Sequence, residues 1–453
     1  MNTILGELGK SKKFVELIKN IEEKQSPIGI SGLSNVGMLE TIASINEYSK
    51  KPIAIITYNE IQAKWIMENI QFFTDKAIYF PKKDIVTYDY VAESKDLPYS
   101  RIEALNKINS KRNYILVTTI EAAMQKLPAK QLLYKNTLKF KVGEIHSLDK
   151  IKQNLVNLGY TRCDLIEGRG QFSLRGGILD ISINDAIGVR VEFWGDEIDS
   201  IRNFNIISQR SINTLEKVEI EPAHEYILEK PIEEICKKVR KTIANDEQEE
   251  IIEQDIEQIK AGNYISKIDK YFDCFYDKQE TIIDYLNTNS IITFDEIRKI
   301  EQRAQNIIKD NEQLIKNLIE KGKVVPQAIS NIQTFSSIEN NTKESKKTII
   351  YIEKQDTKIE RQAQNYNFQY RAINYYKSEI ETLFTDIKKA QEKGKNIYVV
   401  VDTKEKAKKL QEILEQENIM SKIEEKLDKT IIVKSQEKII TIAIGKLTEG
   451  FEN

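Results

Sequence analysis

Residues 171–204 read QFSLRGGILDISINDAIGVRVEFWGDEIDSIRNF, and this stretch decides the fold of the middle of the chain. Apolar and polar residues alternate here in short runs, which is the pattern of half-buried β-strands. Turn-forming pairs separate the runs: Gly-Gly at 176–177, Asn-Asp at 184–185 and Gly-Asp at 195–196. Because such connections are too short for a helical crossover, the stretch predicts an antiparallel meander.

On the N-terminal side of the meander, short apolar runs alternate with longer amphipathic stretches. This alternation predicts βαβ units and a mostly parallel sheet over residues 1–127. Strands are expected at 28–30, 52–57, 77–80 and 114–117, and helices at 38–50, 60–73, 101–111 and 120–126. A strand is expected at 138–142 and a helix at 148–158, immediately before the meander. Together with the meander they indicate a second, α+β domain over residues 128–220.

On the C-terminal side the chain becomes helical and then returns to an α/β pattern. Residues 221–328 are rich in Glu, Lys and Ile at helical spacing, which indicates solvated amphipathic helices. Residues 329–346 are polar and predict a linker, and residues 347–453 predict a small α/β domain whose role the sequence does not assign. The longer elements are expected at 230–258, 290–294, 297–321, 348–353, 397–402, 430–433 and 439–442.

The composition limits the class of protein. The 453 residues carry 68 Lys and Arg against 70 Asp and Glu, so a surface coated in positive charge is excluded, although a local basic patch is not. Cys163, Cys236 and Cys274 are far apart, which excludes a disulfide scaffold or zinc ribbon. With only two His and no apolar run of the roughly 20 residues that span a membrane, we expect a cytoplasmic protein without a metal site or membrane contact.

A phosphate-binding loop is expected after the first strand, and residues 32–39, GLSNVGML, stand in that place. A functional loop has the pattern GxxxxGK[ST], in which the Lys reaches the phosphates and the hydroxyl residue holds Mg²⁺. Gly32 and Gly37 fit this pattern, but Met38 replaces the Lys and Leu39 replaces the hydroxyl residue. The glycines either form only a tight turn or mark a nucleotide-binding fold that has lost its catalytic residues.

The usual second partner of such a loop is an acid at the end of a buried strand. The candidate strand at 114–117 runs into Thr118-Thr119-Ile120, without an acid. We therefore expect no catalytic residue and no nucleotide cofactor in this chain. The predicted fold class is α/β multidomain: a degenerate RecA-like or P-loop-like parallel-sheet lobe, an inserted α+β antiparallel-meander domain, a helix-rich segment and a small α/β domain.

Residues 158–181, LGYTRCDLIEGRGQFSLRGGILDI, and residues 191–200, VEFWGDEIDS, carry a specific resemblance. They resemble the second domain of the bacterial transcription-repair coupling factor (Mfd) family, in the module that this family shares with the excision-repair helicase UvrB. Matching segments elsewhere extend the resemblance over essentially the whole chain: Phe80-Pro81, the run RIEAL that begins at Arg101, PAHE at 222–225, SQRS at 208–211 and GKLTEGF at 445–451.

The resemblance implies the N-terminal portion of a longer protein, acting as a non-catalytic adaptor that recruits UvrA to stalled RNA polymerase. RNA polymerase, DNA, ATP and Mg²⁺ would then be bound by domains beyond residue 453, where the family has an ATP-dependent DNA translocase. The connection at 88–98 is too short for the long aromatic hairpin with which UvrB clamps DNA. The alternatives are a UvrB-type ATP-dependent protein that handles damaged DNA and a direct DNA-binding module.

The resemblance places a UvrA-binding surface in the second domain, and Arg162, Arg175, Arg169 and Phe172 are its candidate residues. Arginine is favoured at such interfaces because its planar donors match carboxylates. We rank Arg175 and Arg162 above Arg169, and Phe172 last. Side chains alternate along a strand, so Ser173 shares the face of Arg175 while Phe172 points to the other face.

Two other assignments stay open in this segment. Arg175 has an internal alternative, an ion pair with Asp180 or Glu192 that would hold the meander together. Trp194, beside the Gly-Asp turn, is expected to pack within the domain rather than to contact a partner.

Overall fold

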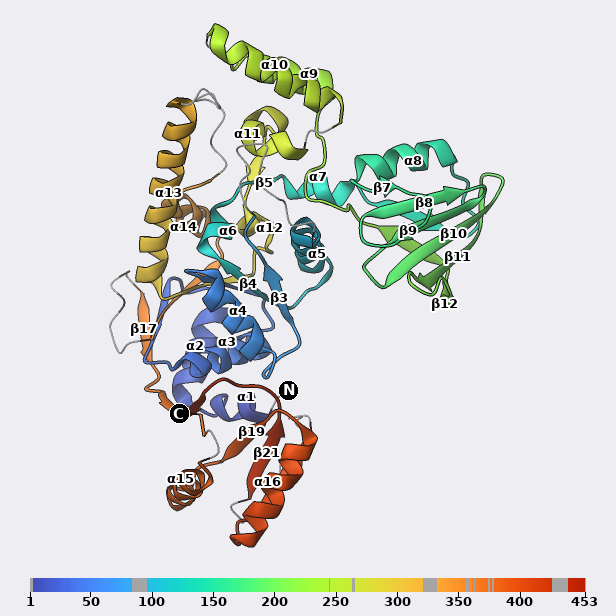
Figure 1. Cartoon of the computed structure of the whole chain (residues 1–453). Helices are drawn as coiled ribbons and strands as arrows, with labels where there is room; N and C mark the ends of the chain where they lie inside the picture. Colours follow the sequence, from blue (N-terminus) through green and yellow to red (C-terminus); the bar gives the residue numbers. More distant parts are fainter. Residues whose placement is uncertain are drawn as a thin grey trace.

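A seven-stranded parallel sheet forms the centre of this computed structural model, which describes residues 3–83, 96–243, 245–262, 265–320, 332–354, 359, 361, 363–373, 375–376, 379–425 and 439–452. The strand order is β17-β1-β16-β15-β2-β4-β3 (Figure 1). The strands are β1 (Ile28–Ser31), β2 (Ile53–Thr57), β3 (Ala77–Phe80), β4 (Ile115–Thr119), β15 (Ile291–Asp295), β16 (Thr348–Glu353) and β17 (Gln364–Asn367). The mixed α/β fold class is confirmed.

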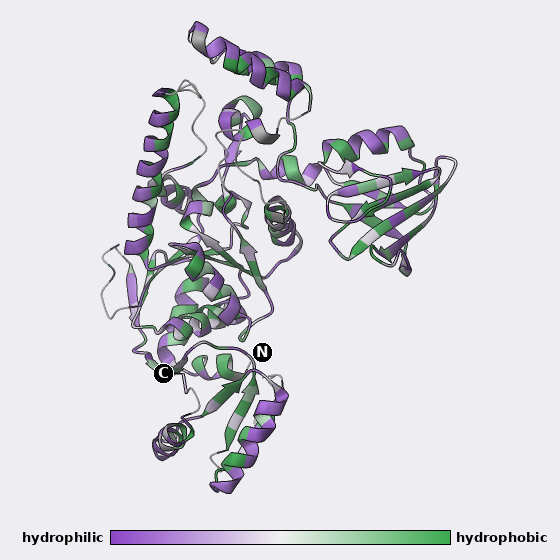
Figure 2. Ribbon diagram, in the orientation of Figure 1, coloured by the Kyte–Doolittle hydropathy of each residue, from purple (hydrophilic) through white to green (hydrophobic). Residues whose placement is uncertain are grey.

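The strands and helices expected in the first lobe are present, with ends that differ by a few residues. Every residue of β1, β2 and β4 is buried, as parallel strands covered on both faces require. Helices pack on both faces, and Figure 2 shows the apolar colouring concentrated there. These helices are α1 (Thr3–Leu8), α2 (Lys12–Glu22), α3 (Asn35–Ser49), α4 (Glu60–Ile70), α5 (Asp96–Ser110) and α6 (Ile120–Met124).

The central sheet also takes strands from segments that the sequence places outside the first lobe. β15 comes from the segment 221–328, and β16 and β17 come from the segment 347–453. The stretch 329–346, expected to be a linker, contains helix α14 (Phe335–Glu344) in its described part. The helix forms because Thr334 caps its first turn, and it packs through Ile338 and Thr342, which are both fully buried.

The antiparallel meander is confirmed as a separate sheet, which lies to the right in Figure 1. Consecutive strands pair antiparallel, and the short strand β7 adds parallel to the edge. Helix α8 (Leu148–Asn157) covers one face, with Ile151 and Leu155 buried. The strands are β7 (Thr161–Arg162), β8 (Gln171–Arg175), β9 (Ile178–Ser182), β10 (Ile187–Trp194), β11 (Glu197–Asn205) and β12 (Ser211–Leu215).

A narrow neck joins this meander domain to the rest of the chain. Strand β6 (Leu138–Lys141) enters the domain and pairs antiparallel with β13 (Lys217–Ile220), which leaves it. Helix α7 (Lys130–Lys135) precedes the neck, and β5 (Leu127–Pro128) pairs with β14 (Gln279–Glu280) beside it.

The helix-rich segment and the last α/β unit complete the fold. The helix expected at 230–258 is two helices, because Asn245 caps a new start. Polar and apolar residues alternate along the outer helices in Figure 2, as amphipathic helices require. The helices of the segment are α9 (Ile232–Arg240), α10 (Asp246–Lys260), α11 (Ile265–Phe275), α12 (Ile282–Tyr285) and α13 (Ile297–Glu320).

The last unit is a small parallel sheet with two helices. It contains α15 (Ile380–Glu392), β19 (Tyr398–Val401), α16 (Lys404–Gln416), β20 (Ser421–Glu424) and β21 (Ile440–Ile444). Strands β18 (Arg371–Ile373) and β22 (Gly450–Glu452) pair beside it, and the strand expected at 430–433 lies outside the described residues. Within the described ranges, no helix combines the length and the apolar character needed to cross a membrane.

Candidate partner-binding site and degenerate phosphate loop

The loop at residues 32–39 has the tight turn and capped helix start of a phosphate-type loop, with apolar side chains at two of its positions. Gly32 has a φ of +70°, which permits the tight turn between β1 and α3. Ser34 caps α3, and its Oγ accepts a 3.0 Å hydrogen bond from the amide of Gly37. Met38 and Leu39 are fully buried in the core of the lobe. Their side chains therefore pack the fold at the positions where a phosphate loop has its lysine and its metal-binding hydroxyl.

A segment far along the chain packs against the loop. We call residues 367–370 the strap. The amide of Phe368 donates to the carbonyl of Ser31 at 3.0 Å, and the amide of Tyr370 donates to the carbonyl of Gly32 at 2.7 Å. The ring of Tyr370 lies so close that a Cβ at Gly37 would be 2.3 Å from its Cδ1. The strap thus packs against the loop, with the ring of Tyr370 beside the start of α3.

The strap is joined to α3 by a buried polar contact. The Tyr370 hydroxyl donates a 2.7 Å hydrogen bond to Oε2 of Glu40, whose side chain is fully buried. Burial raises the pKa of Glu40 to about 7, and the hydrogen bond from Tyr370 opposes part of that rise. Oε1 of Glu40 has no hydrogen-bond partner among the described residues.

An acid is present at the end of a buried strand, the one expected at 290–294, although the sequence alone did not single it out. Asp295 ends β15, which lies two strands from β1 with β16 between them. Its Oδ2 accepts hydrogen bonds from Thr57 Oγ1 at 3.1 Å and Gln62 Nε2 at 3.2 Å, and burial raises its pKa. The apolar run 291–294 followed by Asp-Glu was the signal that could have found it.

The neighbouring acid is committed to ion pairs. Glu296 lies 2.7 Å from Lys299 and 2.9 Å from Lys354, which lower its pKa against the effect of burial. Within the described part of the chain, no group of three or more His, Cys, Asp or Glu side chains is arranged to hold a metal ion. Glu296 is therefore paired within the chain, and Asp295 is the buried acid at the end of β15.

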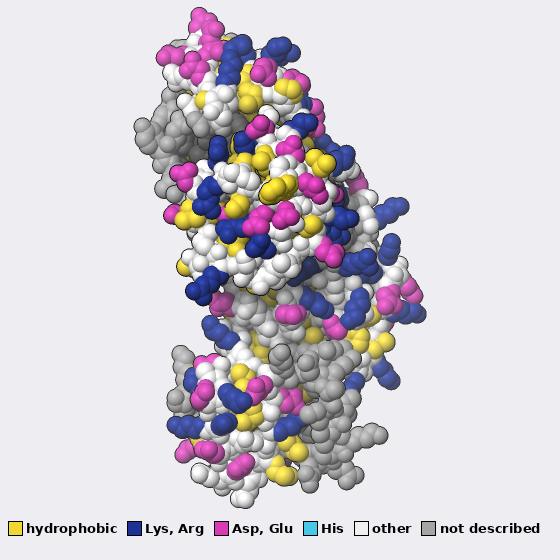
Figure 3. All heavy atoms as spheres, turned by 90° about the vertical axis from the view of Figure 1, so that its right-hand side faces the viewer, with side chains coloured by type: hydrophobic (Ala, Val, Ile, Leu, Met, Phe, Trp, Pro, Cys, Tyr) yellow, Lys and Arg dark blue, Asp and Glu magenta, His cyan; other side chains and the backbone are white. Residues whose placement is uncertain are grey.

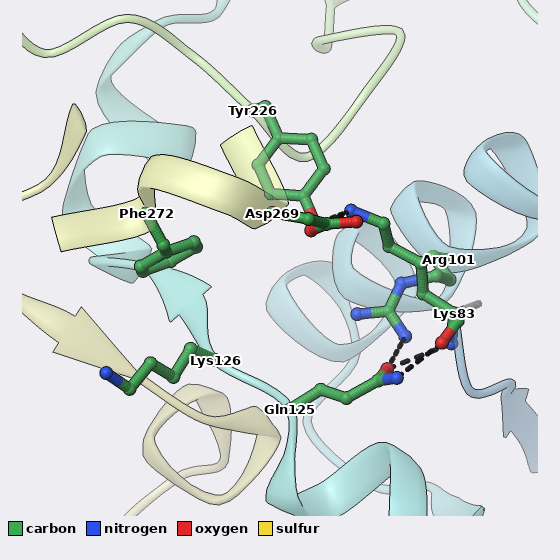
Figure 4. Close-up of a pocket in the computed structure, with 7 residues that line it drawn as sticks. All are labelled: Lys83, Arg101, Gln125, Lys126, Tyr226, Asp269 and Phe272. Carbon is green, nitrogen blue, oxygen red and sulfur yellow. Dashed lines mark hydrogen bonds and ion pairs between the residues drawn. The ribbon is translucent and has the colours of Figure 1, made fainter. Parts of the chain in front are cut away.

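Three of the motifs that carry the resemblance meet in one buried cluster, shown in part in Figure 4. The Arg101 guanidinium lies 4.2 Å from the Phe80 ring centroid, and its Nη1 donates to the carbonyl of Pro81 at 2.7 Å. Its Nε is 3.0 Å from both carboxylate oxygens of Glu225. Because the arginine and the glutamate are almost fully buried, this cluster holds the lobe and the helix-rich segment together.

The pocket beside this cluster has its cations already paired. Lys83 lies 2.6 Å from Asp269 and donates a 2.7 Å hydrogen bond to the Tyr226 hydroxyl (Figure 4). Lys126, at the other end of the pocket, lies 3.4 Å from Asp273. This pairing leaves the pocket without an excess of positive charge for an anionic ligand.

Arg175 lies at the end of β8, on the face of the meander opposite α8. Its Nη2 is 3.1 Å from Oδ2 of Asp180, so the internal pairing left open by the sequence is present. Asp180 is fully buried and also accepts two bonds from Arg190, at 2.6 and 2.9 Å. Glu192, the other candidate, pairs with Arg202 instead. Arg175 remains 51% exposed, since Arg190 is the principal partner of Asp180.

Arg162 and Phe172 lie on the other face of the same sheet. Cross-strand partners point to the same side of a sheet, and Arg162 is paired with Phe172 in the register of β7 and β8. Phe172 is fully buried beneath α8, which removes it from the candidate contact surface. Arg162 is exposed because β7 is the edge strand. The structure therefore does not bring Arg162 and Arg175 onto one face.

Arg169 links the meander domain to the first lobe. Its Nε lies 2.7 Å from Asp185, and its Nη1 lies 3.2 Å from Glu103 of α5. The adjacent Gly170 packs against Tyr99 of α5, where a Cβ would lie 2.3 Å from the hydroxyl. Arg169 is thus used within the chain, at the contact between the domain and α5.

Trp194 does not pack within the domain as the sequence analysis expected. Its side chain is 85% exposed at the end of β10. The reason is its position in the alternation of β10, where Val189 and Val191 point into the core and Trp194 points to the opposite face. The connection at 88–98, expected to be too short for an aromatic hairpin, falls largely on residues 84–95, outside the described ranges.

Comparison with known families agrees with this architecture. Residues 138–226, the meander domain with its neck, match the family model of the UvrB interaction domain. The chain is similar to the transcription-repair-coupling factor of Bacillus subtilis (strain 168), at 28% identity over 78% of this chain and 31% of that protein. The protein of that name in Staphylococcus aureus (strain bovine RF122 / ET3-1) is 29% identical over 65% of this chain and 26% of its own length.

The predicted resemblance to the N-terminal portion of transcription-repair coupling factors is therefore confirmed. The chain spans about a third of the length of these curated relatives. A solved structure named XPD_Helicase covers 98% of this chain and 80% of its own at 10% identity, with a TM-score of 0.25. A score this low defines no shared fold.

Proposed function

We propose that this chain is a non-catalytic adaptor in transcription-coupled DNA repair, and that its meander domain recruits UvrA. The observation that carries the proposal is the exposed guanidinium of Arg175 on a domain that matches the UvrB interaction domain. The relatives are transcription-repair coupling factors, and the match covers 31% of the length of the first of them. Contacts with RNA polymerase and DNA, and an ATP-driven translocase, would belong to the rest of such a protein.

The local charges support Arg175 as the main contact. Arg190 already makes two hydrogen bonds to Asp180, so the buried carboxylate is compensated without Arg175. Among the described residues, Arg175 makes one hydrogen bond, through Nη2. Its Nε and Nη1 therefore remain as donors, and a partner's carboxylate could accept from them in the planar geometry that arginine favours.

Arg162 is the second candidate, at the β7 edge. Because it lies beside Phe172 rather than beside Arg175, a partner that binds both must wrap around this edge. Reversing the charge at Arg162 and at Arg175 one at a time distinguishes the contribution of each arginine to binding. Arg169 is ranked last, since its two ion pairs fix the domain against α5.

The strap supports the non-catalytic part of the proposal. It packs against the loop, and buried Met38 and Leu39 replace the residues that contact phosphate and metal. One observation favours the alternative of a nucleotide-dependent protein, namely Asp295 at the end of β15. Mg²⁺-ATP binding decides between the two, as set out below. The interspersed acidic and basic side chains on the face in Figure 3 do not favour a direct DNA-binding module.

The experiment is the affinity of purified UvrA for the chain and for charge-reversal variants. We expect Arg175→Glu to weaken binding at least tenfold, about 1.4 kcal/mol, and Arg162→Glu to weaken it less. Lys150→Glu, an equal charge change on α8, is the control and should bind like the parent. Unchanged affinity of Arg175→Glu would rule out the proposed site, and no binding by the parent chain would rule out the adaptor function.

A further inference from the structure

The meander domain exposes large apolar side chains at one of its ends. Trp194 is 85% exposed, Ile145 is 76% exposed and Ile178 is 39% exposed. We call these three residues the Trp194 corner. A tryptophan side chain is seldom this exposed to solvent. Tryptophan is also enriched among the residues that dominate the binding energy of protein–protein interfaces. The corner is therefore a candidate contact surface that the sequence analysis did not recognise.

Strand register places the corner in one continuous surface. Trp194 is the cross-strand partner of Glu197, and Glu197 is in turn bridged to Ile145. Because directly opposed residues point to the same side of a sheet, the indole and the isoleucine flank Glu197. The pairing of β10 with β11 shifts after Glu192, where the extra residue lies on β11. Side chains along β10 therefore continue to alternate between the two faces of the sheet.

The same register joins the corner to Arg175. Ile178 is the partner of Arg175 on one side and of Glu192 on the other. Trp194 follows Glu192 by two residues on β10 and so points to the same face. Arg175 and Trp194 thus lie on one face of the meander, separated by β9 and joined through Ile178.

The opposite end of this face is closed. The Ser173 hydroxyl donates a 2.8 Å hydrogen bond to the carbonyl of Asp164, in the loop between β7 and β8. Ile166 from the same loop packs with Phe204 and Ile206 in a small buried cluster. The accessible part of the face is therefore confined to the end that holds Arg175 and the Trp194 corner.

Acidic residues surround the corner. Asp196, Glu197 and Asp199 are exposed, and none of them forms an ion pair with a described residue. An apolar centre with an uncompensated acidic rim complements an apolar pocket rimmed by Lys or Arg. These three carboxylates disfavour a nucleic-acid backbone as the occupant of the corner, since its charge has the same sign as theirs.

We propose that Trp194 is the apolar anchor of the interface that Arg175 begins, and that it inserts into a pocket of UvrA rimmed by basic residues. This inference rests on the proposed recruitment of UvrA. It adds a residue and a contact chemistry to that function. Arg175 would meet an acidic group of UvrA, and Trp194 with Glu197 would meet an apolar and basic one. Figure 3 views the molecule from the side of this domain, where apolar side chains lie among charged ones.

The test compares UvrA binding by two matched variants. Trp194→Ala should weaken binding about 30-fold or more, whereas Ile207→Ala should stay within about twofold of the parent. Ile207 is the control because it is 88% exposed and lies in the turn at the opposite end of β11. Glu197→Lys should weaken binding through the acidic rim. Thermal melting checks the fold of each variant, which removal of an exposed side chain should leave unchanged.

A second readout follows the indole itself. The chain has two tryptophans, and the ring nitrogen of Trp65 is bonded to Thr448 at 2.8 Å. In a chain labelled with 5-fluorotryptophan, a Trp65→Phe variant assigns the two ¹⁹F resonances. UvrA should shift the resonance of Trp194 and leave that of Trp65 in place.

The outcomes separate the two proposals. Loss of binding in Trp194→Ala together with a shifted Trp194 resonance supports the anchor. If Arg175→Glu loses binding while Trp194→Ala binds like the parent with an unshifted resonance, the anchor is wrong and the recruitment function stands. If the parent chain does not bind UvrA, both proposals are wrong.

Discussion

The hydroxyl of Tyr370 donates a 2.7 Å hydrogen bond to Oε2 of Glu40, across 330 residues of sequence. This contact joins the helix that begins at the degenerate phosphate loop to the strap that packs against the loop. It is buried, and the second carboxylate oxygen of Glu40 has no partner among the described residues. In this structure the loop region is thus a site of contact between two segments of the same chain.

The buried carboxyl of Glu40 predicts a pH dependence of stability. Its pKa is raised from an ordinary value of 4.5 to about 7 by burial, so the folded chain holds a proton that the unfolded chain releases. This contribution is fully present below pH 4.5 and is lost as pH rises through 7. Glu40→Gln keeps an acceptor for Tyr370 and removes the titration. Relative to the parent, the variant should gain on the order of 2–3 kcal/mol between pH 4.5 and pH 8.

Urea unfolding at several pH values measures this difference. A free-energy difference between Glu40→Gln and the parent that stays constant from pH 4.5 to pH 8 would contradict the assignment. Tyr370→Phe should destabilise the chain by about 1–3 kcal/mol, because it leaves Glu40 buried without its donor. Tyr376→Phe is the matched control, since it removes an exposed hydroxyl that is also bonded to a carboxylate, Asp386.

The residues at the loop predict no response of the chain to nucleotide. Millimolar Mg²⁺-ATP should leave the melting temperature of the chain unchanged, because Tyr370 lies against Gly37 and the phosphate-contacting residues are replaced. Ligand at about 100 times its Kd stabilises a protein by about 2.7 kcal/mol, which a thermal scan detects as a shift of several degrees. Such a shift in the parent chain would favour the UvrB-type alternative.

The triad of Arg175, Arg190 and Asp180 predicts that Asp180 and Arg190 stabilise the fold, whereas Arg175 serves mainly in binding. Asp180→Asn should cost roughly 2–4 kcal/mol of stability, because it removes the charge that Arg190 is held against. Arg175→Ala should cost less than about 1 kcal/mol, since its pair with Asp180 is half exposed. Chemical denaturation compares both with Asp185→Asn, which alters an exposed ion pair of Arg169. Equal losses in the first two variants would show that Arg175 is a structural residue.

The Arg101–Glu225 pair predicts a strongly coupled double mutant. Arg101→Met should cost about 3–5 kcal/mol, because the Glu225 carboxylate would stay buried without its partner. Adding Glu225→Met should restore part of that loss, and a double-mutant cycle measures the coupling. Arg303→Met, which breaks a more exposed pair with Glu121, should cost much less. Additive losses at Arg101 and Glu225 would contradict the coupling.

Local pattern was sufficient to predict most elements of this fold. The alternation in residues 171–204 predicted the meander and the separate faces of Arg175 and Phe172, because side-chain direction along a strand follows sequence position alone. It did not predict which faces are covered. The sequence therefore left Phe172 among the candidate contacts and expected Trp194 to pack, whereas the structure buries the first and exposes the second.

The sequence did not predict which strands lie next to one another in the parallel sheet. Periodicity identifies β16 as a strand, but hydrogen bonds between parallel strands connect residues far apart in the chain, and no local signal records them. The strand near residue 117 consequently has no acid at its tip, while Asp295 ends β15, another strand of the same sheet that a later segment supplies. The strap escaped notice for the same reason.

The place of β1 in the sheet affects how the protein can be made. Both of its neighbours, β16 and β17, are synthesised about 320 residues or more after it. While the ribosome completes the intervening chain, this apolar strand has open hydrogen-bonding edges on both sides, a condition that invites aggregation. A shortened version ending at residue 346 would keep β1 permanently in that state. A shortened version of this protein should therefore end after the strap.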